Sequence, residues 1–123
     1  MALIHDIGEA IVGDVVKQWG KKLIPNIKQI RKNEADAFKK IFSLIDGEEY
    51  IALFEEYEEM KTPESVFVKQ IDRLEFIIQA LEYEKAHKMK FPRDISVWVS
   101  SIITNKRLKQ ILAHVEKLRR KKW

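Results

Sequence analysis

Residues 62–85 read TPESVFVKQIDRLEFIIQALEYEK and carry the longest helical pattern in the chain. Thr62 is suited to accept a hydrogen bond from a free backbone N–H at a helix start, and Pro63 lacks the N–H that would be unpaired at the first helical position. Apolar residues then recur at alternating steps of four and three, which places them along one side of a helix. These residues are Phe67, Ile71, Leu74, Ile78 and Leu81. We therefore predict a central helix from Pro63 to about Lys85, with this side buried.

The segments on either side of this helix show helical spacing as well. Turn or breaker signals separate them, at Asp46-Gly47 upstream and at Phe91-Pro92 downstream. The expected helices cover residues 27–45, 48–60, 95–102 and 108–115. We predict an all-α fold, a helical bundle of about five to six helices in which residues 1–123 form a single domain.

The composition excludes several classes of protein. The chain has 123 residues, of which 46% are hydrophobic, and this is enough for one core. Cysteine is absent, so disulfide bonds and zinc–thiolate sites are excluded. No apolar run approaches the roughly 20 residues of a membrane span, and the N-terminus lacks the pattern of a signal peptide. We therefore expect a cytoplasmic protein with no membrane partner, in which any metal site uses histidine and carboxylate ligands.

The net charge of +4 comes mainly from the C-terminal end of the chain. A basic tail over residues 117–123 contains Lys117, Arg119, Arg120, Lys121 and Lys122. Cations are favourable at the C-terminal end of a helix dipole, so a solvated helix end is the preferred interpretation. Nucleic-acid binding is ranked last, because Trp123 is the one aromatic residue in the tail that can stack on a base.

The first fifteen residues place titratable groups in an apolar segment. These groups are His5, Asp6, Glu9 and Asp14. Burial without partners costs roughly 2–7 kcal/mol for a neutral polar group and more for a charge. If residues 1–10 are helical, Glu9 lies on the same side of the helix as His5 and Asp6. A divalent cation satisfies imidazole and carboxylates together, whereas the alternative for His5-Asp6 is a core histidine bonded to its neighbour.

Asp72 lies inside the most apolar helix of the chain, one position away from its predicted buried side. Val68 lies four residues before it and Phe76 four residues after it, so Asp72 has apolar neighbours on its own side of the helix. A solvated carboxylate is not usually placed between such neighbours. Polar residues continue from it along the helix, at Glu75, Gln79 and Glu82. The alternative is an exposed polar face, which every amphipathic helix has, and this interpretation is favoured for Glu82 and Glu84.

These motifs occur in a fixed order along the first two thirds of the chain. They are His5-Asp6, Glu9, Gly13-Asp14, FVKQIDRLE at residues 67–75 and QALEYE at residues 79–84. The ordered set resembles the HD superfamily of phosphohydrolases, and within it the oxetanocin-A-like and HD-domain-containing 5'-deoxynucleotidases. The likeness extends from residue 1 to about residue 86, and the set is more specific than any single motif.

The resemblance implies an HD-domain helical bundle and a metal-dependent phosphomonoesterase. Its implied reaction removes the 5'-phosphate from deoxynucleoside monophosphates, with Mn, Co, Mg, Fe or Zn as the metal and a homodimer as the assembly. By position, His5, Asp6 and Asp72 match the metal ligands of the family's H…HD…D signature. Glu9 matches the carboxylate that handles the proton of the attacking water, and Asp14 matches the one that helps to hold a further metal or the substrate.

One element of the family signature has no counterpart here. The signature begins with a histidine some tens of residues before HD, whereas only Met1-Ala2-Leu3-Ile4 precedes His5, and these four residues read as the interior of a buried helix. The other histidines, His87 and His114, lie downstream. We therefore expect the chain to lack the family's N-terminal segment. The alternative function is a catalytically impaired HD-fold interaction module, in which the uncovered apolar surface favours self-association or a partner.

Overall fold

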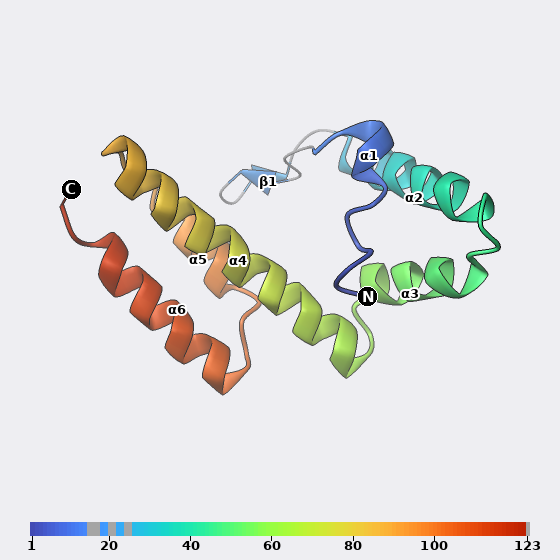
Figure 1. Cartoon of the computed structure of the whole chain (residues 1–123). Coiled ribbons are helices and arrows are strands. Elements are labelled where there is room, and N and C mark those ends of the chain that lie inside the picture. The colour runs from blue at the N-terminus through green and yellow to red at the C-terminus, as the bar shows by residue number, and fades with distance from the viewer. Residues whose placement is uncertain (15–17, 20–21, 24–25, 123) are drawn as a thin grey trace. The chain divides into compact units, whose positions relative to one another are not determined.

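A computed structural model describes residues 1–14, 18–19, 22–23 and 26–122. Within these residues, six α-helices and one antiparallel pair of two-residue strands follow one another (Figure 1). The elements are α1 (Glu9–Val12), β1 (Gln18–Trp19), β2 (Lys22–Leu23), α2 (Ile27–Ser43), α3 (Glu48–Glu59), α4 (Pro63–His87), α5 (Asp94–Ser100) and α6 (Lys106–Arg119). The all-α class is confirmed, and the strand pair was not predicted. No helix in the described part of the chain combines the length and the apolar character needed to cross a membrane.

Two compact units divide the chain, Met1–Val68 and Lys69–Trp123. The boundary falls within α4, which begins in the first unit and continues through the second. Each unit has its own apolar cluster, and the two are described separately below. That residues 1–123 form a single domain stays a prediction.

The first unit is built around stacked aromatic rings. Its core consists of Phe38, Phe42 and Phe54, with Ile4, Ile7, Ala35, Ile41 and Ile51 packed against it. The ring of Phe38 lies 4.4 Å from that of Phe42 and 4.3 Å from that of Phe54, between ring centres. Because Ile4 and Ile7 reach this cluster, the segment that carries the His-Asp motif is packed onto α2 and α3.

The N-terminal segment is not the helix that the sequence suggested. Residues 2–8 form consecutive turns, and α1 begins only at Glu9. A Cβ atom on Gly8 would lie 2.6 Å from the carbonyl oxygen of Glu34, so this glycine permits a close approach to α2 that any other residue would prevent. Leu3 is 95% exposed, so the prediction that residues 1–4 are the interior of a buried helix is wrong.

The start of α4 is capped as the sequence predicted. The backbone N–H of Ser65 donates to Thr62 Oγ1 at 3.2 Å, and the N–H of Thr62 donates to Ser65 Oγ at 3.1 Å. This reciprocal pair satisfies two backbone donors that have no partner inside the helix. The helix ends at His87, two residues beyond the predicted end, because Lys88 adopts a left-handed conformation with φ of 52°.

The buried side of α4 differs from the predicted one. Leu74 is buried as expected, but Ile71 and Ile78 are 40% and 37% exposed. The core of the second unit contains Leu74, Ile77 and Ala80 of α4 together with Ile95, Val99, Ile103, Leu108, Leu112 and Val115. Gln70 and Glu84 are buried on this side as well, because other parts of the unit supply their hydrogen-bond partners.

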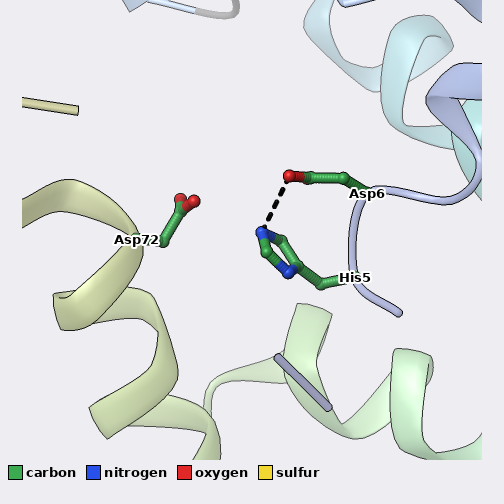
Figure 2. A group of neighbouring side chains, drawn as sticks. All are labelled: His5, Asp6 and Asp72. Carbon is green, nitrogen blue, oxygen red and sulfur yellow. Dashed lines mark ion pairs between the residues drawn. The ribbon is translucent and has the colours of Figure 1, made fainter. Parts of the chain in front are cut away.

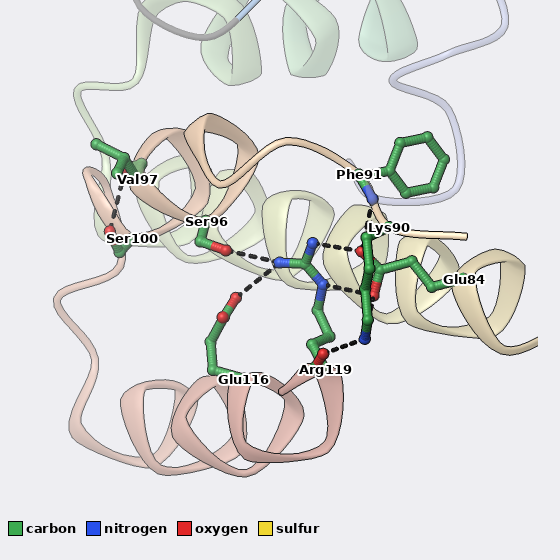
Figure 3. Close-up of polar contacts among 8 residues, drawn as sticks. All are labelled: Glu84, Lys90, Phe91, Ser96, Val97, Ser100, Glu116 and Arg119. Carbon is green, nitrogen blue, oxygen red and sulfur yellow. Dashed lines mark hydrogen bonds and ion pairs between the residues drawn. The ribbon is translucent and has the colours of Figure 1, made fainter. Parts of the chain in front are cut away.

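Glu84 corrects the prediction of an exposed polar face. Its side chain is fully buried and is paired with Arg119, one of the cations of the predicted solvated tail (Figure 3). Arg119 is itself 8% exposed and also donates to Ser96 Oγ and Glu116 Oε1. The end of α6 is therefore held against α4 and α5 by a buried ion pair, although Arg120, Lys121 and Lys122 are exposed as predicted.

Candidate metal centre

His5 and Asp6 form a close pair within the N-terminal turns. The Nε2 atom of His5 lies 3.0 Å from Oδ2 of Asp6 (Figure 2). On the other side of the ring, Nδ1 of His5 lies 2.7 Å from the carbonyl oxygen of Ala2. A carbonyl oxygen only accepts hydrogen bonds, so Nδ1 carries a proton and donates it to Ala2.

This tautomer determines what the other ring nitrogen can bind. In a neutral ring with the proton on Nδ1, Nε2 carries a lone pair, and it faces a carboxylate oxygen that is also an acceptor. Two acceptors 3.0 Å apart repel each other unless a proton or a cation lies between them. The pair therefore fits either an imidazolium–carboxylate ion pair or a divalent ion bound by both atoms. In metal sites, a ligating histidine usually donates its second N–H to a carbonyl or carboxylate, as His5 does.

The aromatic ring of Tyr57, in α3, packs against the imidazole ring of His5. Its ring centre lies 4.8 Å from that of His5, with the planes inclined by 52°, and Tyr57 is 2% exposed. The hydrogen bond to Ala2 and this ring contact together restrict the orientation of His5. Sequence analysis did not link Tyr57 to the site, because no spacing pattern relates a residue of α3 to a motif more than fifty positions upstream.

Glu9 is the first residue of α1, and Asp14 lies two residues after its last residue, Val12. The backbone N–H of Glu9 donates to the carbonyl of Asp6 at 3.0 Å, so Glu9 belongs to the same run of turns as the His-Asp pair. The helix ends at Val12, its C-cap Gly13 has φ of 80°, and Asp14 follows as an exposed residue. The half-buried Glu9 is thus connected to the pair through the backbone, whereas Asp14 lies beyond the helix. The catalytic roles of both residues stay predictions.

Asp72 lies in the part of α4 that belongs to the second unit. Figure 2 labels it on this helix. The residues at positions 70 and 73 are tied to the 104–105 segment and to α5, respectively. Asp72 thus projects from a helix with anchored neighbours, and its role as a metal ligand with His5 and Asp6 stays a prediction.

Comparison with known proteins identifies the family. The HD domain family matches residues 1–114. The 5'-deoxynucleotidase HDDC2 of Dictyostelium discoideum is 42% identical over 86 residues, which are 69% of this chain and 44% of that protein. The human 5'-deoxynucleotidase HDDC2 is 41% identical over 87 residues, covering 68% of this chain and 41% of that protein. The 5'-deoxynucleotidase hdd1 of Schizosaccharomyces pombe is 33% identical across 100% of this chain and 64% of its own length.

The chain spans less than half the length of the first two relatives. No solved structure matches it. The family match includes the His-Asp motif, α1 and Asp72, and it extends over nearly the whole chain. The chain therefore belongs to the HD domain family.

Proposed function

We propose that this chain is a metal-dependent phosphohydrolase that removes the 5'-phosphate from deoxynucleoside monophosphates. His5, Asp6 and Asp72 are the proposed ligands of a divalent ion, which is Mn, Co, Mg, Fe or Zn. Membership of the HD domain family and the names of the 5'-deoxynucleotidase relatives support this function. The cytoplasmic location expected from the sequence and the homodimer implied by the resemblance belong to the same proposal.

The observation that carries the proposal is the pairing of His5 with Asp6. Nε2 and Oδ2 are 3.0 Å apart, and Nδ1 is already committed to Ala2. A neutral imidazole and a carboxylate are both good ligands for Mn, Fe, Co and Zn. An imidazolium–carboxylate ion pair is the alternative for these two atoms, and membership of the HD domain family favours the divalent ion.

The residues of the chain divide the proposed reaction between them. A bound divalent ion supplies Lewis acidity toward a phosphate oxygen and toward water. The carboxylate of Glu9 accepts the proton of the attacking water as its oxygen forms a bond to phosphorus. The bond between phosphorus and the 5'-oxygen then breaks, and Glu9 returns the proton to that oxygen, which gives a nucleoside and inorganic phosphate. The exposed Asp14 assists in holding the substrate or a further metal.

Paramagnetic NMR tests the ligand set directly. Mn²⁺ broadens the signals of nuclei close to it, so a ¹⁵N-labelled sample should lose the amide signals of residues 4–7 and 71–73 together during a titration. Asp72→Ala should abolish this joint broadening, while Glu75→Ala, an exposed carboxylate of the same helix, should leave it unchanged. Broadening confined to residues 4–7 would contradict Asp72 as a ligand.

Assays of phosphate release test the reaction itself. Deoxynucleoside monophosphates should be hydrolysed in the presence of Mn²⁺ or Co²⁺, and matched ribonucleotides should be hydrolysed more slowly. Failure of the full chain to release phosphate despite Mn²⁺ binding at these residues would contradict the proposed activity and leave the metal site intact.

A further inference from the structure

We infer that Gln70 and Arg73 are positioning residues, which determine the direction in which α4 presents Asp72. Neither is proposed to touch the metal ion or the substrate. The inference rests on the proposed function, since Asp72 is a metal ligand only within that proposal. Gln70 and Arg73 would contribute to metal binding indirectly, because they fix the rotation of α4 about its axis and so the direction of the Asp72 side chain.

Gln70 ties α4 to the segment that leads into α6. It is only 3% exposed, and its Oε1 accepts hydrogen bonds from the backbone N–H groups of Thr104 and Asn105, both at 2.9 Å. Its Nε2 donates to Thr104 Oγ1 at 3.2 Å. Asn105 is the N-cap of α6, where its side chain accepts from Arg107 and Leu108. An apolar side chain at position 70 would leave two backbone donors without this acceptor, which costs about 1–3 kcal/mol each when they are buried.

Arg73 ties the same turn of α4 to α5. Its Nη1 donates to the carbonyl oxygen of Trp98 at 2.7 Å, and its guanidinium carbon lies 3.7 Å from the centre of the Trp98 ring. Phe76 contacts the same indole edge-on, with ring centres 5.2 Å apart. The carbonyl of Trp98 lies near the C-terminal end of α5, where a cation is favourable. This contact combines a hydrogen bond, a cation–π interaction and the helix dipole.

The positions of these two anchors around the helix explain their effect on Asp72. One residue advances an α-helix by about 100°, so Gln70 and Arg73 lie on the same side of Asp72, about 160° and about 100° around the helix from it, and only about 60° from each other. Because Gln70 contacts the 104–105 segment and Arg73 contacts α5, rotation of α4 about its axis displaces both anchors from their partners. Plausible metal–ligand distances lie within about 0.2 Å of their usual values, so a small rotation of this helix removes the carboxylate from coordinating distance.

The sequence context supports a positioning role over a purely structural one. Gln70 and Arg73 flank Asp72 in the KQIDRLE motif, and the polar groups of both side chains form hydrogen bonds within the second unit. If position 70 required only packing in the core, leucine or methionine would fill it, as Leu74 does one turn further along the helix. Polar anchors are directional, whereas apolar contacts are not, so they specify the rotation of the helix.

Mn²⁺ affinity of the full chain, measured by the EPR signal of free Mn²⁺, tests the inference. Gln70→Met keeps the length of the side chain and removes its hydrogen bonds. It should weaken Mn²⁺ binding by about 10–100-fold, the usual effect of losing a group that orients a metal ligand. Leu112→Ala is the control, because it removes packing from the same core without touching either anchor. It should leave the Mn²⁺ affinity of the folded chain unchanged.

Urea unfolding of both variants separates positioning from stability. The Mn²⁺ affinities are compared at a temperature where both variants remain folded. Weaker binding in Gln70→Met but not in Leu112→Ala supports the positioning role of Gln70. If Gln70→Met does not fold, Arg73→Met provides the same comparison through the other anchor and should also weaken Mn²⁺ binding. Equal affinities of the anchor variant and Leu112→Ala would overturn the inference.

Asp72→Ala distinguishes this failure from failure of the proposed function. If Asp72→Ala loses Mn²⁺ binding while the anchor variants bind normally, only the positioning inference is overturned. If Asp72→Ala binds Mn²⁺ as the unaltered chain does, the proposed ligand set is wrong and the inference falls with it.

Discussion

Arg119 binds Glu84 through two parallel hydrogen bonds. Its Nη2 lies 2.7 Å from Oε1 of Glu84, and its Nε lies 3.1 Å from Oε2 (Figure 3). The backbone N–H of Phe91 donates to Oε1 as well, at 2.9 Å, and the ammonium group of Lys90 lies 3.8 Å from Oε2. Lys90 also donates to the carbonyl oxygen of Arg119. This network links α4, the segment before α5 and α6.

Removing one partner of this pair should destabilise the chain strongly. Arg119→Met leaves the buried carboxylate of Glu84 without its main counter-charge, and the expected loss is about 3–5 kcal/mol in the free energy of unfolding. The double variant Glu84→Leu/Arg119→Met should recover most of this loss, because neither charge then remains buried. Urea unfolding of the variants measures both effects.

Glu116→Gln is the matched control for the ion pair. Glu116 is only partly buried and accepts from Arg119 Nη1 at 3.2 Å, so its loss should cost no more than about 1 kcal/mol. A similar cost for Glu116→Gln and Arg119→Met would contradict a dominant contribution from the Glu84–Arg119 pair.

The stability of the second unit should decrease at acidic pH through Glu84. Burial raises the pKa of this carboxyl, but hydrogen bonds from Arg119 and Phe91 and the charges of Arg119 and Lys90 outweigh it, so the pKa lies below its ordinary value of 4.5. In the unfolded chain the carboxyl takes up its proton at a higher pH than in the folded chain. The stabilisation is therefore complete above pH 4.5 and is lost as the pH falls through the lower, folded-state pKa.

Urea unfolding between about pH 3 and about pH 7, a range that includes the ordinary carboxyl pKa of 4.5, measures this dependence. The unaltered chain should lose more stability over this range than the double variant Glu84→Leu/Arg119→Met, which lacks the titrating group. Arg119 does not contribute in this range, because its pKa is raised by Glu84 despite burial and lies far above it. Parallel pH profiles for the two proteins would contradict the assignment to Glu84.

Glu9→Ala should separate proton transfer from metal binding. If Glu9 accepts the proton of the attacking water, its removal should lower kcat for a deoxynucleoside monophosphate by about 10²–10⁴-fold while most Mn²⁺ binding remains. Asp72→Ala should lose metal and activity together. Release of the metal by Glu9→Ala would identify Glu9 as a ligand, and an unchanged kcat would make Asp14 the next residue to test.

Gly8→Ala should disturb the N-terminal turns and the metal site with them. The added methyl group would lie 2.6 Å from the carbonyl oxygen of Glu34, which forces the segment away from α2. We expect a loss of about 1–3 kcal/mol in unfolding free energy, typical of overpacking, and weaker Mn²⁺ binding.

Gly13→Ala is the comparison for this substitution. Among the described residues, no atom lies within 4 Å of a Cβ placed on Gly13, but its φ of 80° strains an alanine. It should therefore lose stability without the loss of Mn²⁺ affinity that Gly8→Ala shows. Equal Mn²⁺ affinities in the two variants would contradict a role for the Gly8 packing in positioning His5.

The sequence by itself determined where the long helices lie and which family the chain resembles. The start of α4 at Thr62-Pro63 was predictable because a cap depends on residues within one turn of each other. The all-α class followed from apolar spacing, which is also a local property. The His5-Asp6 motif was recognisable for the same reason, since its two residues are adjacent.

The tertiary structure alone decided which side of α4 is buried and how the N-terminal segment is folded. Gln70 and Glu84 are buried because hydrogen-bond partners satisfy their polar groups there. These partners, at Thr104, Asn105 and Arg119, lie more than thirty residues away along the chain. Residues 2–8 form turns, and Gly8 at their end packs against the backbone of Glu34, a contact that the local sequence pattern does not reveal. Spacing patterns report which residues share a side of a helix, but burial of a polar side requires partners that only the folded chain brings to it.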